Sequence, residues 1–449
     1  MLFERIVSPG LAHNSYILGS RDSAAVIDPR RDAWTYGEVA RRNHMRITHI
    51  FETHRNEDYV IGSLELADIT DADVYHGAAL DFDYGVPVEE GDTFSLGTLR
   101  LDVLETPGHT DESISIVVTN TAVSSEPYMV FTGDALFAGD VGRTDLYGSD
   151  ERERLATALH DSLHGKLLPL GDHVIVCPAH GSGSVCGGSI GDLPLTTIGY
   201  ERRSNPMLQL DRQSFIKRKK RERLHRPPYF RQMEVYNRWG PPLLHRMPRP
   251  MRLSPGKLAE MTDEVQPVDV RRPECFAAAH IPGSLNMWSH ALAGIAGWFL
   301  SYDMPVALIG DDDDVALRSL VRLGYDDLAE LQGGIGAWQQ SGQPVGHIDV
   351  WHAGRLHKQL DDDGVFILDV RTGRSRSEHG HIPGSEHVYL GDLPDRLGDL
   401  PSGGTIVVYC DAGYKTGTAA SLLMRGGFDD VVELVGGIAA WKQAGYPVD

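Results

Sequence analysis

The sequence predicts an α/β protein built from several domains, and three observations support that prediction. The chain has 449 residues, enough for about three domains of ordinary size. A long segment occurs twice in its second half. In the first half, short apolar runs end in His or Asp, as strands do when polar groups follow them at one edge of a sheet.

The repeat indicates a duplicated domain. The motif Asp-Val-Arg and the later His-Ile-Pro-Gly return after 100 and 101 residues, and Glu330–Trp338 returns as Glu433–Trp441 after 103. A period this long indicates two tandem copies of one domain rather than a solenoid. Within each copy, β-rich runs such as 365–370 and 405–409 alternate with helical stretches, which predicts a parallel α/β domain.

These features predict four segments. Residues 1–205 form one domain, 206–258 an ordered connector, 259–346 the first copy and 347–449 the second copy. The connector is rich in Arg, Pro and Tyr, and its aromatic residues indicate packing rather than disorder.

Composition excludes several functional classes. The formal net charge of -21 argues against nucleic acid as a partner, and we interpret the basic run 217–223 as a solvated helix face. No apolar run approaches the roughly 20 residues that span a bilayer, so we expect a cytoplasmic protein without a membrane partner. Four cysteines without a CxxC pair form neither a disulfide framework nor a structural zinc site.

Four polar side chains in the first domain follow predicted strands. The runs 47–51, 99–104, 129–131 and 173–176 lead to His54, His109, Asp134 and His180. Because such positions converge on one edge of a sheet, the pattern predicts a metal site.

The segment Thr53-His54-Arg55-Asn56-Glu57-Asp58-Tyr59 resembles the Thr-His-x-His-x-Asp-His motif of the metallo-β-lactamase fold, an αββα sandwich. Asn56 and Tyr59 stand where that motif has histidines. A two-zinc hydrolase needs both imidazoles, and an amide is a poor zinc ligand. Two imidazoles and one carboxylate instead suit mononuclear Fe(II) with O₂ as co-substrate.

The segments 106–113, 131–137, 139–145, 178–187 and 199–203 are similar to persulfide dioxygenases, a branch of that superfamily. The resemblance implies iron held by His54, His109 and Asp134, with oxidation of a persulfide to sulfite and thiol. Around the ion we expect Asn56, Asp58, Tyr59 and His180. Cys186 is a candidate for carrying or approaching persulfide sulfur, and the candidates for binding an anionic substrate are Arg143, Arg202 and Arg203.

The second copy carries a candidate nucleophile. The strand 405–409 leads to Cys410, a tight loop and a helix from Thr416, which resembles the rhodanese motif Cys-x-x-Gly-x-Arg-Ser/Thr. Loop N–H groups and a helix N-terminus cradle an anion, so we expect a lowered thiol pKa and a stabilised persulfide. The expected cradle consists of Asp411, Ala412, Gly413, Tyr414, Lys415 and Thr416. Lys415 keeps the charge of the family's Arg without its bidentate geometry.

The first copy should be inactive. Gly310 stands where the nucleophile would be, and Asp311 to Asp314 replace the cradle with negative charge. We expect this pseudo-rhodanese to serve as a scaffold or interface.

The domain order resembles bacterial persulfide dioxygenase–rhodanese fusions. That resemblance implies that sulfite accepts sulfur from Cys410 to give thiosulfate, and that the chain forms a homo-oligomer. The substrate thiol stays open among glutathione, coenzyme A, bacillithiol, mycothiol and inorganic persulfide. Two other functions also stay open: a glyoxalase II-like zinc thioester hydrolase, and a sulfur carrier with a decayed metal site.

Overall fold

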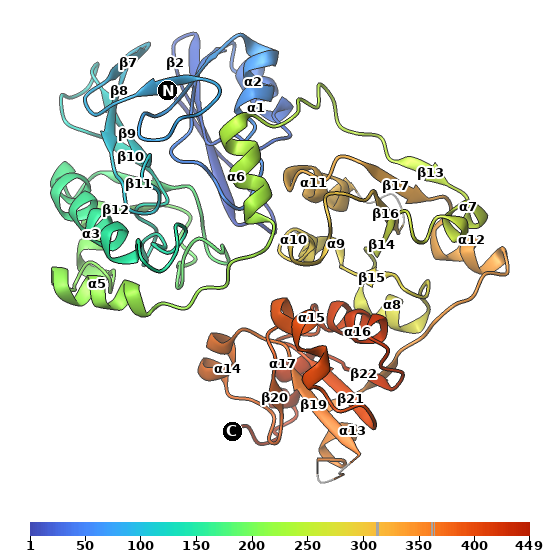
Figure 1. Ribbon diagram of the computed structural model, residues 1–449. Helices are drawn as coiled ribbons and strands as arrows, with labels where there is room; N and C mark the ends of the chain where they lie inside the picture. The colour runs from blue at the N-terminus through green and yellow to red at the C-terminus, as the bar shows by residue number, and fades with distance from the viewer. Residues whose placement is uncertain (311–313, 361, 363) are drawn as a thin grey trace. The chain divides into compact units, whose positions relative to one another are not determined.

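The computed structural model describes residues 1–310, 314–360, 362 and 364–449 (Figure 1). It divides into two compact units, Met1–Met247 with Arg322–Gly324 and Pro248–Val321 with Tyr325–Asp449. Within the described residues, no helix has the length and apolar character needed to cross a bilayer.

Two six-stranded sheets form the centre of the first unit. The first has the order β1 to β6. Its strands are β1 (Leu2–Ser8), β2 (His13–Ser20), β3 (Ser23–Ile27), β4 (Arg46–Phe51), β5 (Asp73–Gly77) and β6 (Val86–Val88). The second has the order β12-β11-β10-β9-β8-β7. Its strands are β7 (Thr93–Leu96), β8 (Leu99–Glu105), β9 (Ile114–Asn120), β10 (Met129–Gly133), β11 (Ile175–Pro178) and β12 (Thr196–Thr197).

The sheets pack face to face through a core to which both contribute: Tyr16, Leu18, Phe51, Leu101, Ile116 and Phe131. Helices α1 (Trp34–Arg42) and α2 (Ser63–Thr70) cover the outer face of the first sheet. The second sheet is covered by α3 (Arg152–Ser162), α4 (Ile198–Ser204) and α5 (Arg212–Arg221). These four layers confirm the expected αββα sandwich.

The expected connector begins as part of this sandwich. Phe215 of α5 is buried in the core beside the second sheet. Helix α6 (Phe230–Trp239) buries Phe230 and Met233, and its Asn237 reaches the loop after β4. The connector is therefore packed against the first unit up to Met247.

The second unit contains two five-stranded parallel sheets of identical order, β13-β17-β16-β14-β15 and β18-β22-β21-β19-β20. The first copy consists of β13 (Met251–Leu253), α7 (Pro255–Glu260), β14 (Gln266–Asp269), α8 (Pro273–Ala278), β15 (Leu285–Asn286), α9 (Ser289–Leu292), α10 (Ala296–Phe299), β16 (Val306–Ile309), α11 (Asp314–Arg322), β17 (Leu328–Leu331) and α12 (Gly334–Gln340). The second consists of β18 (Asp349–Trp351), α13 (Ala353–His357), β19 (Val365–Asp369), α14 (Gly373–His379), β20 (Glu386–His387), α15 (Leu393–Arg396), β21 (Thr405–Tyr409), α16 (Thr416–Arg425), β22 (Val431–Leu434) and α17 (Gly437–Gln443). The shared order confirms the duplicated α/β domain.

The repeated motifs hold each copy together. In the second copy, Arg371 donates to both oxygens of Asp369, at 2.9 and 2.7 Å, and Tyr409 donates to Asp369 at 2.8 Å. In the first copy, Nε of Arg271 donates to Asp269 at 2.9 Å. These buried, charge-assisted bonds fix the loops after β14 and β19, which explains the Asp-Val-Arg repeat.

Candidate metal centre and sulfur-transfer loop

Three predicted metal ligands meet at one end of the sandwich. His54 follows β4, His109 lies between β8 and β9, and Asp134 follows β10. Oδ2 of Asp134 lies 3.6 Å from Nε2 of His54 and 3.4 Å from Nε2 of His109. All three side chains are buried, so the structure brings the predicted triad together in a space shielded from water.

The sequence around β4 and β10 accounts for this approach. The Asp28 carboxylate accepts hydrogen bonds of 2.7 Å from both the backbone N–H and the hydroxyl of Thr53, which fixes the residue before His54. Gly133 has φ 51° and faces Thr53, and a Cβ there would lie 2.6 Å from Thr53 Oγ1. Only glycine satisfies both the conformation and the close contact.

Both histidines are oriented as metal ligands. Thr53 Oγ1 donates to Asp28 and therefore accepts from Nδ1 of His54, 3.0 Å away. Nδ1 of His109 lies 3.1 Å from the Arg143 carbonyl, which can only accept. Each ring therefore keeps a proton on Nδ1 and presents Nε2 to the centre. In metal-binding histidines the ring nitrogen that does not bind the metal usually donates to such an oxygen, which fixes the ring.

The atoms that face the centre have no hydrogen-bond partner among the described residues: His54 Nε2, His109 Nε2, Asp134 Oδ2 and Glu57 Oε2. Buried polar atoms left in this state are costly, and several of them close together fit a bound cation.

The electrostatics agree with that fit. Burial lowers the pKa of His54 to about 4, which keeps its imidazole neutral. Burial raises the pKa of Asp134, but the charge of His180 and the hydrogen bond from its ring outweigh burial and hold the pKa far below its usual range. For His109, burial lowers the pKa, but contacts with Glu57 and Asp134 outweigh it and raise the pKa.

Glu57 is a residue that the sequence reasoning missed. Its Oε2 lies 3.6 Å from Nε2 of His109, and its Oε1 accepts from Arg55 at 3.0 Å. Burial raises the Glu57 pKa, but contacts with His109 and Arg55 outweigh it and lower the pKa. The available signal was a carboxylate inside the histidine motif, next to the Asn56 departure.

Asp58, His180 and Cys186 line the same space. Nδ1 of His180 donates to Oδ1 of Asp134 at 2.7 Å, and its Nε2 lies 3.0 Å from Oδ2 of Asp58. Cys186 Sγ lies within 4.8 Å of ligand atoms of Asp58 and His180, and likewise of His109 and Asp134. Burial raises the Cys186 pKa well above its usual value, and the carboxylates of Asp58 and Asp134 raise it further.

Asn56 and Tyr59 are held by the connector. Asn237 of α6 donates to the Asn56 carbonyl at 2.6 Å and to the Tyr59 carbonyl at 2.8 Å. The Asn56 side chain donates to the His54 carbonyl at 3.1 Å, and the Tyr59 ring centre lies 3.9 Å from that of His13. Both residues therefore shape the loop that carries His54.

The three arginines proposed for substrate binding have other contacts. Buried Arg143 donates to Asp145 at 2.7 Å and to the Val185 and His225 carbonyls, so it ties the Cys186 loop to the connector. Arg202 and Arg203 are exposed and pair with Asp172, at 2.9 and 3.4 Å. The cation beside the metal centre is instead Arg55.

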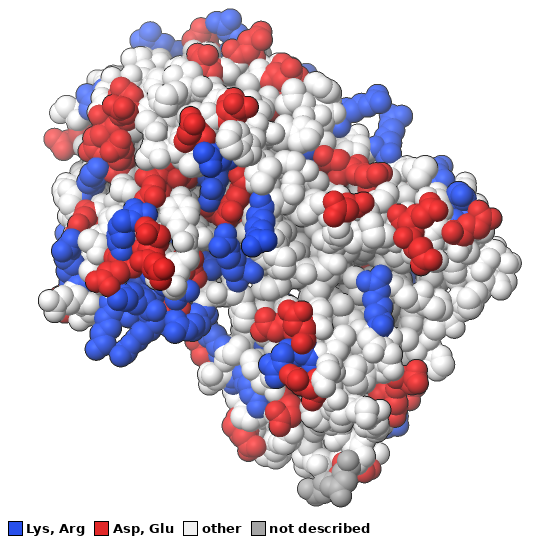
Figure 2. Space-filling view, viewed as in Figure 1, with Lys and Arg blue, Asp and Glu red and all other residues white. Residues whose placement is uncertain are grey.

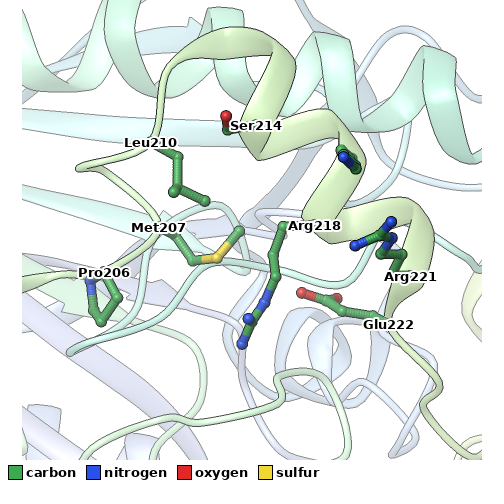
Figure 3. A pocket seen from close by; sticks show the side chains of 8 residues that line it. Pro206, Met207, Leu210, Ser214, Arg218, Arg221 and Glu222 are labelled. Atoms are coloured by element: carbon green, nitrogen blue, oxygen red, sulfur yellow. The ribbon is translucent and has the colours of Figure 1, made fainter.

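Residues 217–221 of the basic run form the C-terminal half of helix α5, where Lys and Arg gather at the lower left of Figure 2. A pocket of about 630 Å³ adjoins it, and Arg218 extends between Met207 and Glu222 (Figure 3). Lys219 is buried and donates to Glu222 at 2.6 Å. None of the predicted ligands lines this pocket, so it is separate from the metal centre.

The Cys410 loop forms the expected cradle in outline. The thiol sulfur accepts from the backbone N–H groups of Gly413 at 3.2 Å and Lys415 at 3.4 Å. Gly413 has φ 92°, a conformation that turns its N–H inward. Thr416 donates to the Gly413 carbonyl at 2.7 Å, which closes the loop at the start of α16. Of the other loop residues, Asp411 is held at 3.8 Å from Arg371, and Tyr414 is half exposed.

The prediction of a lowered thiol pKa is wrong for this loop. Burial raises the pKa of Cys410, and the N–H groups of Lys415 and Gly413 with the Lys415 charge offset only part of that effect. The sequence showed the donors but not that the sulfur is enclosed, at 2% exposure.

The first copy presents no equivalent cradle where it is described. A Cβ at Gly310 would lie 2.6 Å from Val270 Cγ2, so a cysteine there would clash, while Cys275 is exposed on α8. Asp311 to Asp313 lie outside the described residues. The first copy instead packs against α16: Thr418 donates to the Asn286 carbonyl at 2.6 Å, and the Trp288 and Tyr414 rings lie 4.9 Å apart (Figure 1).

Comparison with known proteins finds a matching family model for each half of the chain. The metallo-β-lactamase superfamily model matches residues 8–180, and the rhodanese-like domain model matches 254–341 and 352–444. The mitochondrial persulfide dioxygenase of Bos taurus is 28% identical over 229 residues, which cover 48% of this chain and 80% of that protein. Hydroxyacylglutathione hydrolase GloC of Haemophilus influenzae is 28% identical over 216 residues, covering 43% and 91%.

A solved structure extends the likeness across both halves. The crystal structure of a metallo-β-lactamase from Staphylococcus aureus subsp. aureus COL aligns with a TM-score of 0.67 and 30% identity, covering 74% of this chain and 99% of that one. Together with the domain order and the two sites, these matches show that the chain belongs to the persulfide dioxygenase–rhodanese fusion family.

Proposed function

We propose that this enzyme oxidises a low-molecular-weight thiol persulfide with O₂ and transfers persulfide sulfur to the sulfite formed. The oxidation is RSSH + O₂ + H₂O → RSH + SO₃²⁻ + 2H⁺. The observation that carries the proposal is that buried ligand atoms of His54, His109 and Asp134 have no hydrogen-bond partner among the described residues. Two imidazoles and one carboxylate are the donor set of non-haem Fe(II) oxygenases.

His54, His109 and Asp134 would hold the ion through Nε2, Nε2 and Oδ2. A bound Fe(II) supplies the redox chemistry that O₂ needs to oxidise sulfur. The protein's own contribution is orientation and shielding: Thr53 and the Arg143 carbonyl fix the two rings, and His180 holds the other oxygen of Asp134. Cys186 lies close to ligand atoms of His109 and Asp134 and would meet the persulfide there.

The second half-reaction takes place at Cys410. Its thiolate takes the outer sulfur of RSSH, releasing RSH and leaving a persulfide on Cys410. Sulfite then attacks that outer sulfur, the S–S bond breaks, and thiosulfate leaves with the Cys410 thiolate restored. The N–H groups of Gly413 and Lys415 point at the sulfur and would stabilise the anion at both stages. Joining the two activities in one chain raises the effective concentration of sulfite at Cys410.

A hydrolase of the thioesterase type is the second candidate, and one observation favours it. Asp58, His180 and Cys186 form another possible ligand set next to the first, which a two-metal hydrolase would require. The absent histidines at Asn56 and Tyr59 weigh against it.

One experiment separates the two functions. The full chain is purified without oxygen, its metal content is measured, and O₂ consumption is followed with a panel of persulfides beginning with glutathione persulfide. One iron per chain with O₂ uptake supports the dioxygenase. Two zinc ions per chain, thioester cleavage and no O₂ uptake would replace it with the hydrolase. The panel also identifies the thiol, and size-exclusion chromatography tests the proposed homo-oligomer.

A further inference from the structure

We infer that Glu57 is a fourth protein ligand of the metal ion, so that two imidazoles and two carboxylates hold it. The inference rests on the proposed function only for the presence of an ion at His54, His109 and Asp134.

Glu57 lies close to two of the predicted metal ligands. One ligand atom each of His54, Glu57 and His109 lies within 4.8 Å of the others. Oε2 of Glu57 lies 3.6 Å from Nε2 of His109, close to the 3.4 Å that separates this nitrogen from Asp134. The Glu57 and Asp134 side chains are both fully buried, and both carboxylates approach the same atom, Nε2 of His109.

The hydrogen bonds of Glu57 also support its role as a metal ligand. Arg55 donates to Oε1 of Glu57 at 3.0 Å, whereas Oε2 has no hydrogen-bond partner among the described residues and lies 3.6 Å from Nε2 of His109. A buried carboxylate oxygen without a partner is strongly unfavourable. The arginine thus satisfies one oxygen and aims the other at the ion.

Glu112 shows that this arrangement is specific. It is as buried as Glu57 and also contacts Arg55, whose backbone N–H donates to Oε1 at 2.9 Å. Its other oxygen accepts from Tyr147 at 3.3 Å. Both Glu112 oxygens are therefore used, and Glu112 belongs to none of the possible ligand sets. Burial of an acid beside Arg55 does not by itself leave an oxygen free.

A fourth protein ligand would change which further ligands the metal ion can bind. An ion held by the triad and by Glu57 would keep fewer open positions for other ligands than an ion held by the triad alone. The second carboxylate also cancels the remaining positive charge of a divalent ion. The Arg55 guanidinium lies beside this carboxylate, where it pairs with Glu57 and with Glu234.

The test uses Co(II) as the probe in the full-length protein, prepared without metal. Co(II) affinity is measured by competition with a chelator, and the visible absorption of the complex reports its ligand set. We compare wild type with Glu57→Gln and with Glu112→Gln, which removes a neighbouring buried charge outside the ligand set. We expect Glu57→Gln to weaken Co(II) binding about tenfold or more relative to Glu112→Gln, and to change the spectrum.

Equal Co(II) affinities and unchanged spectra in the two glutamine variants would overturn the inference. If Glu57→Gln fails to fold, Glu57→Asp replaces it: its shorter carboxylate should also weaken Co(II) binding, and wild-type affinity would again overturn the inference. The His54→Ala variant distinguishes failure of this inference from failure of the proposed function. Loss of binding in His54→Ala with wild-type binding in Glu57→Gln removes only the fourth ligand. Wild-type binding in His54→Ala removes the metal centre and the proposed function with it.

Discussion

Nδ1 of His180 donates to Oδ1 of Asp134 at 2.7 Å, while Oδ2 of the same aspartate faces His54 and His109. The two oxygens of Asp134 therefore have separate tasks. One is fixed by a buried histidine, and the other is left for the ion. His180 is held in turn by Asp58, 3.0 Å from its Nε2, so a line of three buried groups sets the orientation of one metal ligand.

We predict that His180→Ala retains the metal ion but binds it about 10- to 100-fold more weakly, the usual loss when a group that orients a ligand is removed. Without the imidazole, the Asp134 carboxylate is free to rotate, and its Oδ1 loses a charge-assisted hydrogen bond. Iron stoichiometry and chelator competition on anaerobically purified protein measure the effect.

The same variant distinguishes a mononuclear centre from a two-metal centre. If His180 were itself a ligand with Asp58 and Cys186, His180→Ala would reduce the metal content from two ions to one. A content of one ion in both wild type and variant agrees with our assignment, and a drop from two to one contradicts it.

The two activities should separate by mutation. Cys410→Ser removes the only thiol in the second rhodanese copy and leaves every candidate ligand of the metal centre unchanged. We expect O₂ uptake with glutathione persulfide to remain near the wild-type rate, while thiosulfate yield falls to background and sulfite accumulates. Ion chromatography of the products measures both anions. Undiminished thiosulfate formation in Cys410→Ser would show that Cys410 does not carry the sulfur.

Features that follow from local sequence patterns could be predicted, whereas features that depend on contacts in the folded chain could not. The duplicated domain follows from a repeat, and the meeting of His54, His109 and Asp134 follows from their positions after predicted strands, which are local patterns. The αββα sandwich was implied by the resemblance of one motif to the metallo-β-lactamase fold. Glu57 was missed because its role depends on where Arg55 places one of its oxygens. No spacing rule conveys that contact.

The surroundings of charged groups are harder to predict from the sequence, because burial is a property of the whole fold. Arg143 was expected near an anionic substrate, but its donors are taken by Asp145 and two carbonyls. The Cys410 pKa was expected to fall because the loop offers N–H donors, and those donors are present. The enclosure of the sulfur, which the sequence did not reveal, changes the sign of the shift.

The raised pKa of Cys410 predicts a pH dependence for sulfur transfer. Because the thiolate is the nucleophile, the rate at which Cys410 takes up sulfur should rise with pH and keep rising above the ordinary thiol range. Lys415 lowers the pKa, so Lys415→Ala should move the profile to higher pH, whereas Lys415→Arg should leave it near that of wild type. Single-turnover rates against pH measure the shift. A Lys415→Ala profile that coincides with wild type would exclude the charge effect.

The contact between the two rhodanese copies predicts a stability effect. Gly417 in α16 lies against Asn286 of the first copy, and a Cβ at Gly417 would lie 2.1 Å from Asn286 Oδ1. Gly417→Ala should therefore push the copies apart and lower the free energy of unfolding by about 1–3 kcal/mol, the usual cost of overpacking. Because α16 begins at the Cys410 loop, thiosulfate formation should fall as well.

Gly336→Ala is the matched control, since Gly336 is also helical and a Cβ there meets nothing within 4 Å. It should leave sulfur transfer unchanged and stabilise the protein slightly, because alanine favours helix by about 0.5–1 kcal/mol over glycine. Chemical denaturation of the full chain measures both variants. Equal stability of Gly417→Ala and Gly336→Ala would mean that the first copy does not support α16, and that its role lies elsewhere.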